Sequence, residues 1–262
     1  MDLRGKLVLL TGASSGIGEA LALELAGRRA KLALASRDLR KLKLLAGRCA
    51  RQGAAAARAY RLDVASLSQA KALARRVERE LGPVDALVNN AGVHAFARVA
   101  ELPEALARRA LEVNYLGPLR LIQAVLPGMR SRGVGLIVNV GSNLAYRSIP
   151  TGAAYSASKA ALLRLTESLR DEEACHGIGV LNVAPGVVLT RLRDNALRHG
   201  VDPPAQVSLP FPRSAEVTAR EIADAMQSGQ RDLISAAWPV KLWVRVLVPF
   251  FPRLLDRRMK QA

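Results

Sequence analysis

Short apolar runs alternate along the chain with longer segments in which apolar residues recur every three or four positions. The runs lie at residues 6–11, 31–36, 58–64, 84–89, 133–141 and 178–183. The helical patterns lie at residues 16–29, 39–52, 68–81, 103–132, 152–175 and 215–227. Continuous apolar runs are typical of strands buried on both faces, with helices crossing over between them. The pattern therefore predicts an α/β fold: a doubly wound parallel sheet of about seven strands with helices on both faces.

No linker or low-complexity stretch interrupts this pattern, so we predict one domain over residues 1–237. Within it, residues 186–214 carry four prolines and show no clear periodicity. A long irregular segment in a compact domain is typical of a lid or binding loop. Residues 238–262 form a basic, aromatic tail outside the pattern.

The composition narrows the class of protein. The 262 residues suit one large domain, and 39 Lys and Arg against 22 Asp and Glu give a net charge of +17. Such a charge favours anionic partners, but the basic residues are spread along helices and only 4% of residues are aromatic. We therefore expect no nucleic-acid binding.

Two cysteines, Cys49 and Cys175, are too few for a disulfide scaffold and lack metal-site spacing, so we expect buried thiols, no metal and a reducing compartment. The N-terminus does not resemble a signal peptide, and no run of 18–20 residues is apolar throughout. These features predict a cytoplasmic protein.

A glycine-rich turn follows the first predicted strand and opens a helix. Gly12, Gly16 and Gly18 lie in the segment Thr-Gly-Ala-Ser-Ser-Gly-Ile-Gly. Glycines let a backbone approach a pyrophosphate, and a helix N-terminus supplies N–H donors and a positive dipole. An ordinary strand-to-helix turn is the alternative, but the position favours dinucleotide binding in a Rossmann-like domain.

The end of the second predicted strand indicates which dinucleotide binds. An acid there would bind the ribose 2′-hydroxyl of NAD, whereas a basic residue would accommodate the 2′-phosphate of NADP. Ser36 occupies the expected acidic position and Arg37 follows it. This favours NADP(H) over NAD(H), and we interpret Asp38 as the N-cap of the next helix.

Three further motifs occur in order. Asn89-Asn90-Ala91-Gly92 follows the fourth run, Ser142 follows the fifth, and Tyr155 lies 13 residues later with Lys159 four residues beyond it. Together with the glycine turn, these motifs resemble the short-chain dehydrogenase/reductase family over about residues 5–235. Further residues at matching family positions are Asp63, Val64, Asn114, Pro185, Gly186 and Thr190.

The residue types of the motif also suggest the chemistry. Tyr155 and Lys159 are one helical turn apart and share a face. A phenol with a pKa near 10 needs nearby positive charge to exchange protons at neutral pH, and Lys159 can supply it. Tyr155 would then be the general acid or base and Ser142 would polarise the reacting oxygen. The resemblance adds that Lys159 binds the nicotinamide ribose and that Asn114 holds a water linking Lys159 to solvent.

The other candidate residues divide into a cofactor set and a substrate set. Beyond Tyr155 and Lys159, the resemblance implies that the cofactor is bound by Gly12, Ser14, Ser15, Gly16, Ile17, Gly18, Ser36, Arg37, Asp63, Val64, Asn90, Ala91, Gly92, Pro185, Gly186, Val188 and Thr190. For the substrate we expect contacts with His94, Leu144, Tyr146, Val187, Leu189 and Leu192. Asn89 is interpreted as fixing the central sheet through backbone hydrogen bonds rather than as a cofactor ligand.

The leading hypothesis is an NADP(H)-dependent oxidoreductase that interconverts a carbonyl and an alcohol of an apolar small-molecule substrate. The alternatives are a 3-oxoacyl-carrier-protein reductase, which the basic charge suits, and a non-catalytic NADP-binding regulatory protein. The resemblance implies a homodimer, or a homotetramer, built on the helix at 103–132 and the helix of Tyr155.

For the tail, two interpretations stay open. A helix of about ten residues between Pro239 and Pro249 either contacts a membrane surface peripherally or packs on the protein itself.

Overall fold

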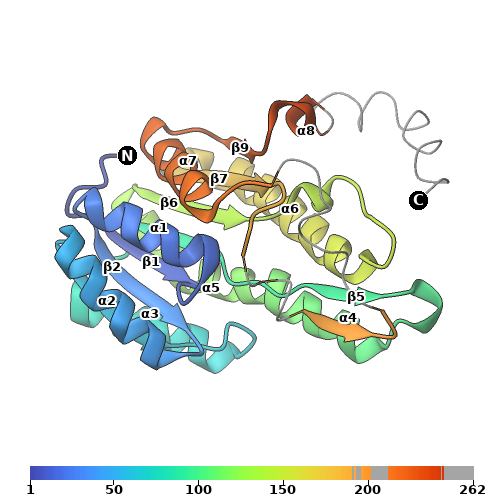
Figure 1. The fold of residues 1–262 in the computed structure, drawn as a ribbon. Coiled ribbons are helices and arrows are strands. Elements are labelled where there is room, and N and C mark those ends of the chain that lie inside the picture. The colour runs from blue at the N-terminus through green and yellow to red at the C-terminus, as the bar shows by residue number, and fades with distance from the viewer. Residues whose placement is uncertain (191, 193–195, 202–211, 243, 245–262) are drawn as a thin grey trace.

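The computed structural model describes residues 1–190, 192, 196–201, 212–242 and 244, and its centre is a parallel sheet of seven strands (Figure 1). The strand order is β3-β2-β1-β4-β6-β7-β9. Their bounds are Leu7–Thr11 (β1), Lys31–Ser36 (β2), Ala56–Arg61 (β3), Ala86–Asn89 (β4), Gly135–Val140 (β6), Ile178–Pro185 (β7) and Asp232–Ser235 (β9). The predicted doubly wound sheet is confirmed.

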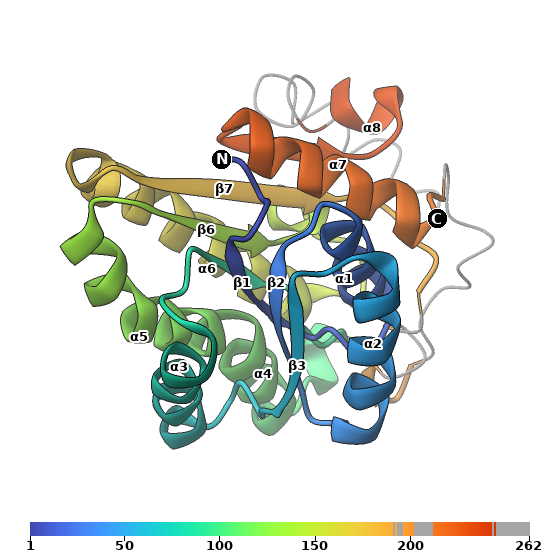
Figure 2. The ribbon, with the colours of Figure 1, turned by 90° about the vertical axis from the view of Figure 1, so that its left-hand side faces the viewer.

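Helices cover both faces of this sheet, as Figure 2 shows. One face carries α1 (Gly16–Gly27), α2 (Leu39–Gln52) and α7 (Ala215–Ser228). The other carries α3 (Leu67–Leu81), α5 (Gly117–Arg132) and α6 (Ala153–Glu173), with α4 (Glu104–Leu111) packed beside α6. Successive strand side chains point to opposite faces. Val8 and Leu10 therefore join the α1 side of the core, whereas Leu7 and Leu9 join the α3 side.

The predicted helix over residues 103–132 is interrupted. Residues Glu112–Leu116 form a π-helical turn (η2) between α4 and α5. Pro118 in the first turn of α5 has no N–H, so the carbonyl of Asn114 lacks the i+4 donor that an α-helix would supply. The interruption thus falls on a predicted catalytic residue.

The hydrophobic pattern did not predict three of the strands, β5 (Ala95–Ala97), β8 (Leu197–His199) and β9. The seventh strand of the sheet, β9, is only four residues long, and β5 pairs in parallel with β8 as a separate two-stranded sheet. Strands this short show too few alternations to be recognised. Strand β8 lies inside the predicted loop 186–214, of which residues 191, 193–195 and 202–211 lie outside the described residues.

The two cysteines differ in their surroundings. Cys49 is buried on α2, where desolvation raises the pKa of its thiol to about 11, as expected of a small apolar side chain. Cys175 is exposed, in the 3₁₀ turn Ala174–His176 (η4), so the expectation of a buried thiol is wrong there. Helix α6 ends at Glu173, two residues earlier than predicted.

The strand order changes direction between β1 and β4. From β1 the chain builds outward to β2 and β3, then returns to place β4 on the other side of β1. In open α/β sheets, a crevice forms at the carboxyl ends of the strands at this point and binds the ligand.

Candidate active site

A cavity of about 360 Å³ lies at the carboxyl ends of β1, β2, β3 and β4. Residues predicted to bind cofactor make up most of its wall: Gly12, Ser14, Ser15, Gly16, Ile17, Ser36, Arg37, Asp63, Val64, Asn90, Ala91, Gly92 and Thr190. Leu192, which we assigned to substrate, lines the same cavity. Sequence reasoning gave no such role to Lys41, Leu62, Val93, Arg109 and Val113, which also line it.

The glycine turn is packed against the segment after β4. Gly12 has φ +64°, and a Cβ there would lie 2.7 Å from the Cα of Ala91. Asn90 holds the turn by donating from Nδ2 to the carbonyls of Thr11 at 3.0 Å and Gly12 at 3.2 Å. Gly18 does not line the cavity, but a Cβ there would lie 2.3 Å from the Gly12 carbonyl oxygen. Gly18 therefore lets α1 approach the turn so closely that the helix N-terminus faces the cavity.

One end of the cavity, next to the carboxyl end of β2, carries basic side chains. Arg37 and Lys41 line it, and Asp38 caps α2 by accepting from the Lys41 backbone N–H at 3.0 Å, which confirms its interpretation as an N-cap. That hydrogen bond is the main reason that the pKa of Asp38 is lowered. Ser36 Oγ accepts from the Asp38 N–H at 3.2 Å. Arg37 and Lys41 thus bring two cations to this end of the cavity, where the Asp38 carboxylate also lies, 3.7 Å from Lys41 Nζ.

Asp63 lies beside this basic end and is held by Arg109 of α4. The Arg109 guanidinium donates to Asp63 Oδ2 at 3.3 Å, and the Ala65 N–H donates to Oδ1 at 3.0 Å. Burial by itself raises the pKa of Asp63, but these two donors lower it overall. The carboxylate therefore stays ionised at the cavity wall.

Tyr155 and Lys159 are both buried on α6. The Lys159 ammonium donates to the carbonyl of Val140 at 2.8 Å, at the carboxyl end of β6. A Cβ at Gly92 in the cavity wall would lie 3.5 Å from Lys159 Nζ, so the ammonium adjoins the cavity. Burial lowers the pKa of Lys159 to about 8, and the group therefore stays mainly protonated at neutral pH.

Asn114 in the π turn links the loop after β4 to α6. Its Oδ1 accepts from the Val93 N–H at 2.9 Å, while its Nδ2 donates to the Val93 carbonyl and to Ser158 Oγ, both at 2.9 Å. Ser158 Oγ in turn donates to the Tyr155 carbonyl at 2.7 Å. This buried chain of hydrogen bonds fixes α6 relative to the cavity wall.

Ser142 follows β6 and starts the 3₁₀ turn Asn143–Ala145 (η3). Its Oγ donates to Asn143 Oδ1 at 3.3 Å and accepts from the Leu144 N–H at 3.1 Å. Asn89 contributes to the sheet, as expected, but through its side chain: Nδ2 donates to Asn139 Oδ1 at 2.9 Å, across the β4–β6 pair.

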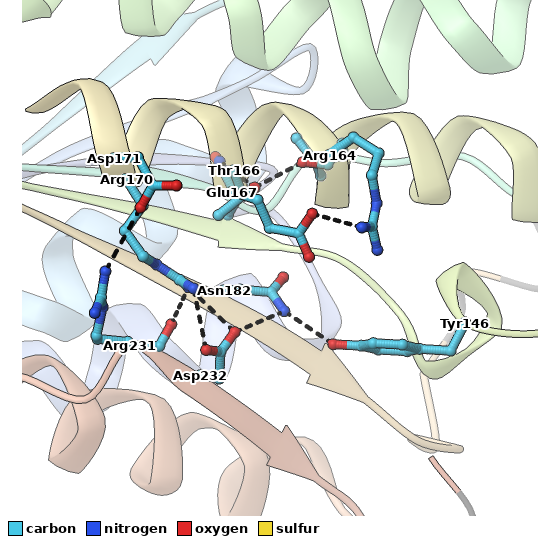
Figure 3. A network of polar contacts seen from close by, with 11 residues as sticks. Tyr146, Arg164, Thr166, Glu167, Arg170, Asp171, Asn182, Arg231 and Asp232 are labelled. Atoms are coloured by element: carbon cyan, nitrogen blue, oxygen red, sulfur yellow. Dashed lines mark hydrogen bonds and ion pairs between the residues drawn. The ribbon is translucent and has the colours of Figure 1, made fainter. Parts of the chain in front are cut away.

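Among the predicted substrate residues, His94 stacks its ring on that of Tyr155 at a centroid distance of 4.0 Å. Tyr146 makes a different contact: its hydroxyl accepts a hydrogen bond from Asn182 Nδ2 at 3.3 Å. Figure 3 shows that this network continues through Asp232 to Arg170. Leu144 and Val187 are half-buried and do not line the described cavity.

The segment after β7 is held at both of its ends. Pro185 ends the strand, the Gly186 N–H donates to the Ser235 carbonyl at 2.9 Å, and Val188 bridges to Arg213. Arg213 is fixed by Glu221 of α7 at 2.7 Å. Thr190 is thereby brought against Gly16, where it lines the cavity, whereas Pro185, Gly186 and Val188 do not line it. The described residues contain no group of three His, Cys, Asp or Glu side chains arranged to hold a metal.

A cavity at the switch point of a doubly wound sheet, with a buried lysine beside it and a tyrosine on the helix of that lysine, is compatible with a nucleotide-dependent oxidoreductase. Comparison with known proteins leads to the same class. The family model described as short chain dehydrogenase matches residues 6–199, and the chain belongs to this family.

Individual relatives cover the chain to different extents. Human dehydrogenase/reductase SDR family member 7 is 36% identical over 200 residues, which is 75% of this chain and 59% of the human protein. The Thermococcus sibiricus alcohol dehydrogenase complexed with 5-hydroxy-NADP is 28% identical with a TM-score of 0.79, covering 90% of this chain and 97% of that one. The Burkholderia phymatum short chain dehydrogenase/reductase in complex with NAD is 27% identical with a TM-score of 0.84, covering 99% and 96%.

Proposed function

We propose that the protein is an NADP(H)-dependent oxidoreductase that transfers hydride between the nicotinamide and a carbonyl or alcohol carbon of an apolar substrate. The observation that carries the proposal is the position of the Lys159 ammonium, which is buried, adjoins the cavity through Gly92 and shares a helix face with Tyr155.

The residues present fit such a cofactor. A Cβ would collide with Ala91 at Gly12 and with the Gly12 carbonyl oxygen at Gly18, so these glycines let the turn and α1 pack closely, and the N-terminus of α1 offers N–H groups to a pyrophosphate. Arg37 and Lys41 suit a 2′-phosphate. When bound, the nicotinamide supplies or accepts the hydride.

The proton is handled by the chain's own residues. Tyr155 donates its phenolic proton to the carbonyl oxygen as an alcohol forms, or accepts a proton from the alcohol in the reverse direction. The positive charge of Lys159 stabilises the phenolate of Tyr155. Ser142 holds the reacting oxygen. Asn114 fixes the loop after β4 relative to helix α6.

The substrate class is identified by following NADPH absorbance with a panel of candidate carbonyl compounds. The panel contains apolar ketones and aldehydes, steroids, quinones, sugars, and 3-oxoacyl chains linked to an acidic carrier protein. Turnover of free apolar carbonyls supports the proposal. Turnover of carrier-linked chains alone would favour the carrier-protein reductase, which the net charge of +17 also suits. If NADPH binds and no substrate is reduced, the chain is a binding protein.

Arg37 is expected to determine the choice of cofactor. The substitution Arg37→Ala removes a charge-assisted contact with the 2′-phosphate, worth about 1.5–3 kcal/mol, so the Kd for NADPH should rise about 10- to 150-fold. The Kd for NADH should change less than about twofold, because NADH carries no 2′-phosphate to lose. Titration of both cofactors by calorimetry measures this difference.

The matched control is Arg40→Ala, which removes an exposed arginine three residues later, in the first turn of α2, that does not line the cavity. Equal affinity of the unsubstituted protein for NADH and NADPH would contradict the assignment of NADP(H).

We also infer a homodimer that uses α5 and α6. These helices cover one face of the sheet and are joined by Arg130, whose Nε donates to the buried Glu173 at 2.9 Å. Sedimentation velocity at micromolar concentration should give twice the chain mass or more. A monomer under these conditions would contradict the inference.

Of the described apolar residues in the tail, some pack on the domain and others are exposed to solvent. Val240 and Val244 pack against the cluster of Ala184, Ile234 and Ala236, whereas Trp238 is 73% exposed and Leu242 is 44% exposed on α8 (Trp238–Leu242). Packing of the tail on its own domain is thus supported for two residues. The predicted helical residues 243 and 245–249 lie outside the described ones. No helix among the described residues is long and apolar enough to span a membrane.

We expect the exposed Trp238 and Leu242 to bind an anionic membrane surface. Tryptophan and leucine beside basic residues suit the headgroup region, and five net positive charges follow from the sequence of residues 238–262. The protein should therefore sediment with phosphatidylserine vesicles, and the double substitution Trp238→Ser with Leu242→Ser should abolish this. Val217→Ser on α7, which also removes an exposed apolar side chain, should have no effect. Failure of the unsubstituted protein to sediment would contradict the expectation.

A further inference from the structure

Three buried aromatic rings lie in one stack that ends on the proposed general acid. The ring of Phe96 lies 5.4 Å from that of His94 with an interplanar angle of 7°. The ring of His94 lies 4.0 Å from that of Tyr155 with an angle of 17°. Phe96 is 1% exposed, His94 9% and Tyr155 4%. These offset or parallel contacts stabilise aromatic pairs beyond the burial of their area.

The backbone around His94 is fixed by the small sheet that the hydrophobic pattern did not predict. The Leu197 N–H donates to the His94 carbonyl at 2.9 Å, and Ala95–Ala97 pair with Leu197–His199. In an extended strand, residues 94 and 96 point to the same side. Both rings are therefore held on the side of Tyr155 by strand pairing.

The side chain between the two rings points the other way and packs closely. Ala95 is fully buried in a cluster with Ala110 of α4 and Ala154 of α6. The Ala97 N–H also donates to the Thr151 carbonyl, two residues before α6, at 3.0 Å. The strand that carries His94 and the helix that carries Tyr155 thus form one packed unit.

We propose that His94 is a positioning residue for Tyr155: its ring covers one face of the phenol and holds the hydroxyl in line with the substrate oxygen. The contact is made through the face of the ring, so planarity rather than the imidazole nitrogens carries the effect. A displacement of the phenol of about 1 Å would cost on the order of 10²-fold in rate, because proton transfer requires hydrogen-bonding distance. The inference rests on the function proposed above for Tyr155.

Four variants separate the ring from its nitrogens. His94→Phe keeps a planar ring without N–H groups, whereas His94→Gln keeps hydrogen-bonding groups without a ring, and His94→Ala keeps neither. We expect kcat to fall at least tenfold in His94→Gln and His94→Ala and less than threefold in His94→Phe. The Kd for NADPH should stay within twofold in all of them. Phe96→Leu, which removes only the outer ring, should have an intermediate effect.

A second measurement does not depend on turnover. The chain has four tyrosines, so 3-fluorotyrosine labelling gives four ¹⁹F signals, and the Tyr155 signal is the one that Tyr155→Phe removes. Loss of the stacked ring should shift and broaden this signal in His94→Gln and His94→Ala. His94→Phe should preserve a single narrow signal.

The outcomes discriminate between the possibilities. An unchanged Tyr155 signal in His94→Ala would overturn the proposal, as would full kcat in His94→Gln. Loss of kcat in His94→Phe equal to that in His94→Ala would show that the nitrogens act, which also overturns it. If the unsubstituted protein reduces no carbonyl while the ¹⁹F signal responds as expected, the proposed function fails and the ring contact stands.

Discussion

Tyr155→Phe should abolish turnover and leave the affinity for NADPH within about twofold. The substitution deletes one hydroxyl and keeps the ring, so the stack with His94 and the packing of α6 are preserved. General acid–base catalysis by a positioned group contributes about 10²- to 10⁴-fold, and the loss should fall in that range. Steady-state kinetics with the best carbonyl from the substrate panel gives kcat, and quenching of protein fluorescence gives the Kd for NADPH.

Tyr146→Phe is the matched control for this experiment. The Tyr146 hydroxyl contacts Asn182 on β7, in the network that Figure 3 shows, and Tyr146 does not line the cavity. Its loss should change kcat little. Should Tyr155→Phe keep more than about a tenth of kcat, a barrier increase below about 1.4 kcal/mol, another group must carry the proton.

The parts of the site that could be predicted from sequence are those in which a residue type is required by local backbone geometry. The turn at Gly12 needs a positive φ and a missing side chain, and Gly18 needs a close helix approach. This glycine turn follows the strand that the first apolar run predicted. The sequence therefore also predicts its position at the carboxyl edge of the sheet. The four-residue spacing of Tyr155 and Lys159 predicts a shared helix face, and both side chains are buried on α6.

The parts that could not be predicted depend on side chains brought together from distant segments. Arg109 reaches Asp63 from α4, which is separated from it by 46 residues, and no local pattern marks the contact. Tyr146 follows a motif residue closely, yet its hydroxyl turns to Asn182 on β7. The small sheet of β5 and β8 joins residues a hundred positions apart through strands of three residues. That sheet holds His94 against Tyr155.

The ionisation of Lys159 is a further property that the sequence motif does not reveal. Burial lowers the pKa of its ammonium from an ordinary 10.5 to about 8. In the folded protein the lysine therefore releases its proton at lower pH than in the unfolded chain. Between pH 8 and 10.5 the unfolded state binds more protons, so the free energy of unfolding must rise with pH through this group.

Lys159→Met should remove this pH dependence. Relative to the variant, the unsubstituted apoprotein should gain about 1 kcal/mol per pH unit between pH 8 and 10.5, about 3 kcal/mol in all. The difference should become constant about one pH unit below 8 and above 10.5, where both states carry the same charge. Urea unfolding at half-unit steps from pH 7 to 11 measures this difference.

The sign of the difference separates Lys159 from the other buried groups. Desolvation raises the pKa of Cys49 to about 11. Desolvation and the neighbouring Glu80 raise the pKa of Tyr60 to about 12. Through these two groups the free energy of unfolding falls as pH rises. They are present in both proteins and cancel in the difference. Lys71→Met, which removes an exposed lysine of α3, should leave the pH profile unchanged.

Lys159→Met should also lower kcat by at least a hundredfold at pH 7, because the charge that stabilises the phenolate of Tyr155 is lost. Loss of the hydrogen bond to the Val140 carbonyl lowers stability equally at every pH, and it therefore adds an offset without changing the slope. Parallel stability curves for the two proteins across pH 8–10.5 would show that Lys159 keeps the proton affinity of a solvated lysine. The ammonium would then be exposed to water rather than buried beside the cavity, and its assigned place next to Gly92 would be wrong.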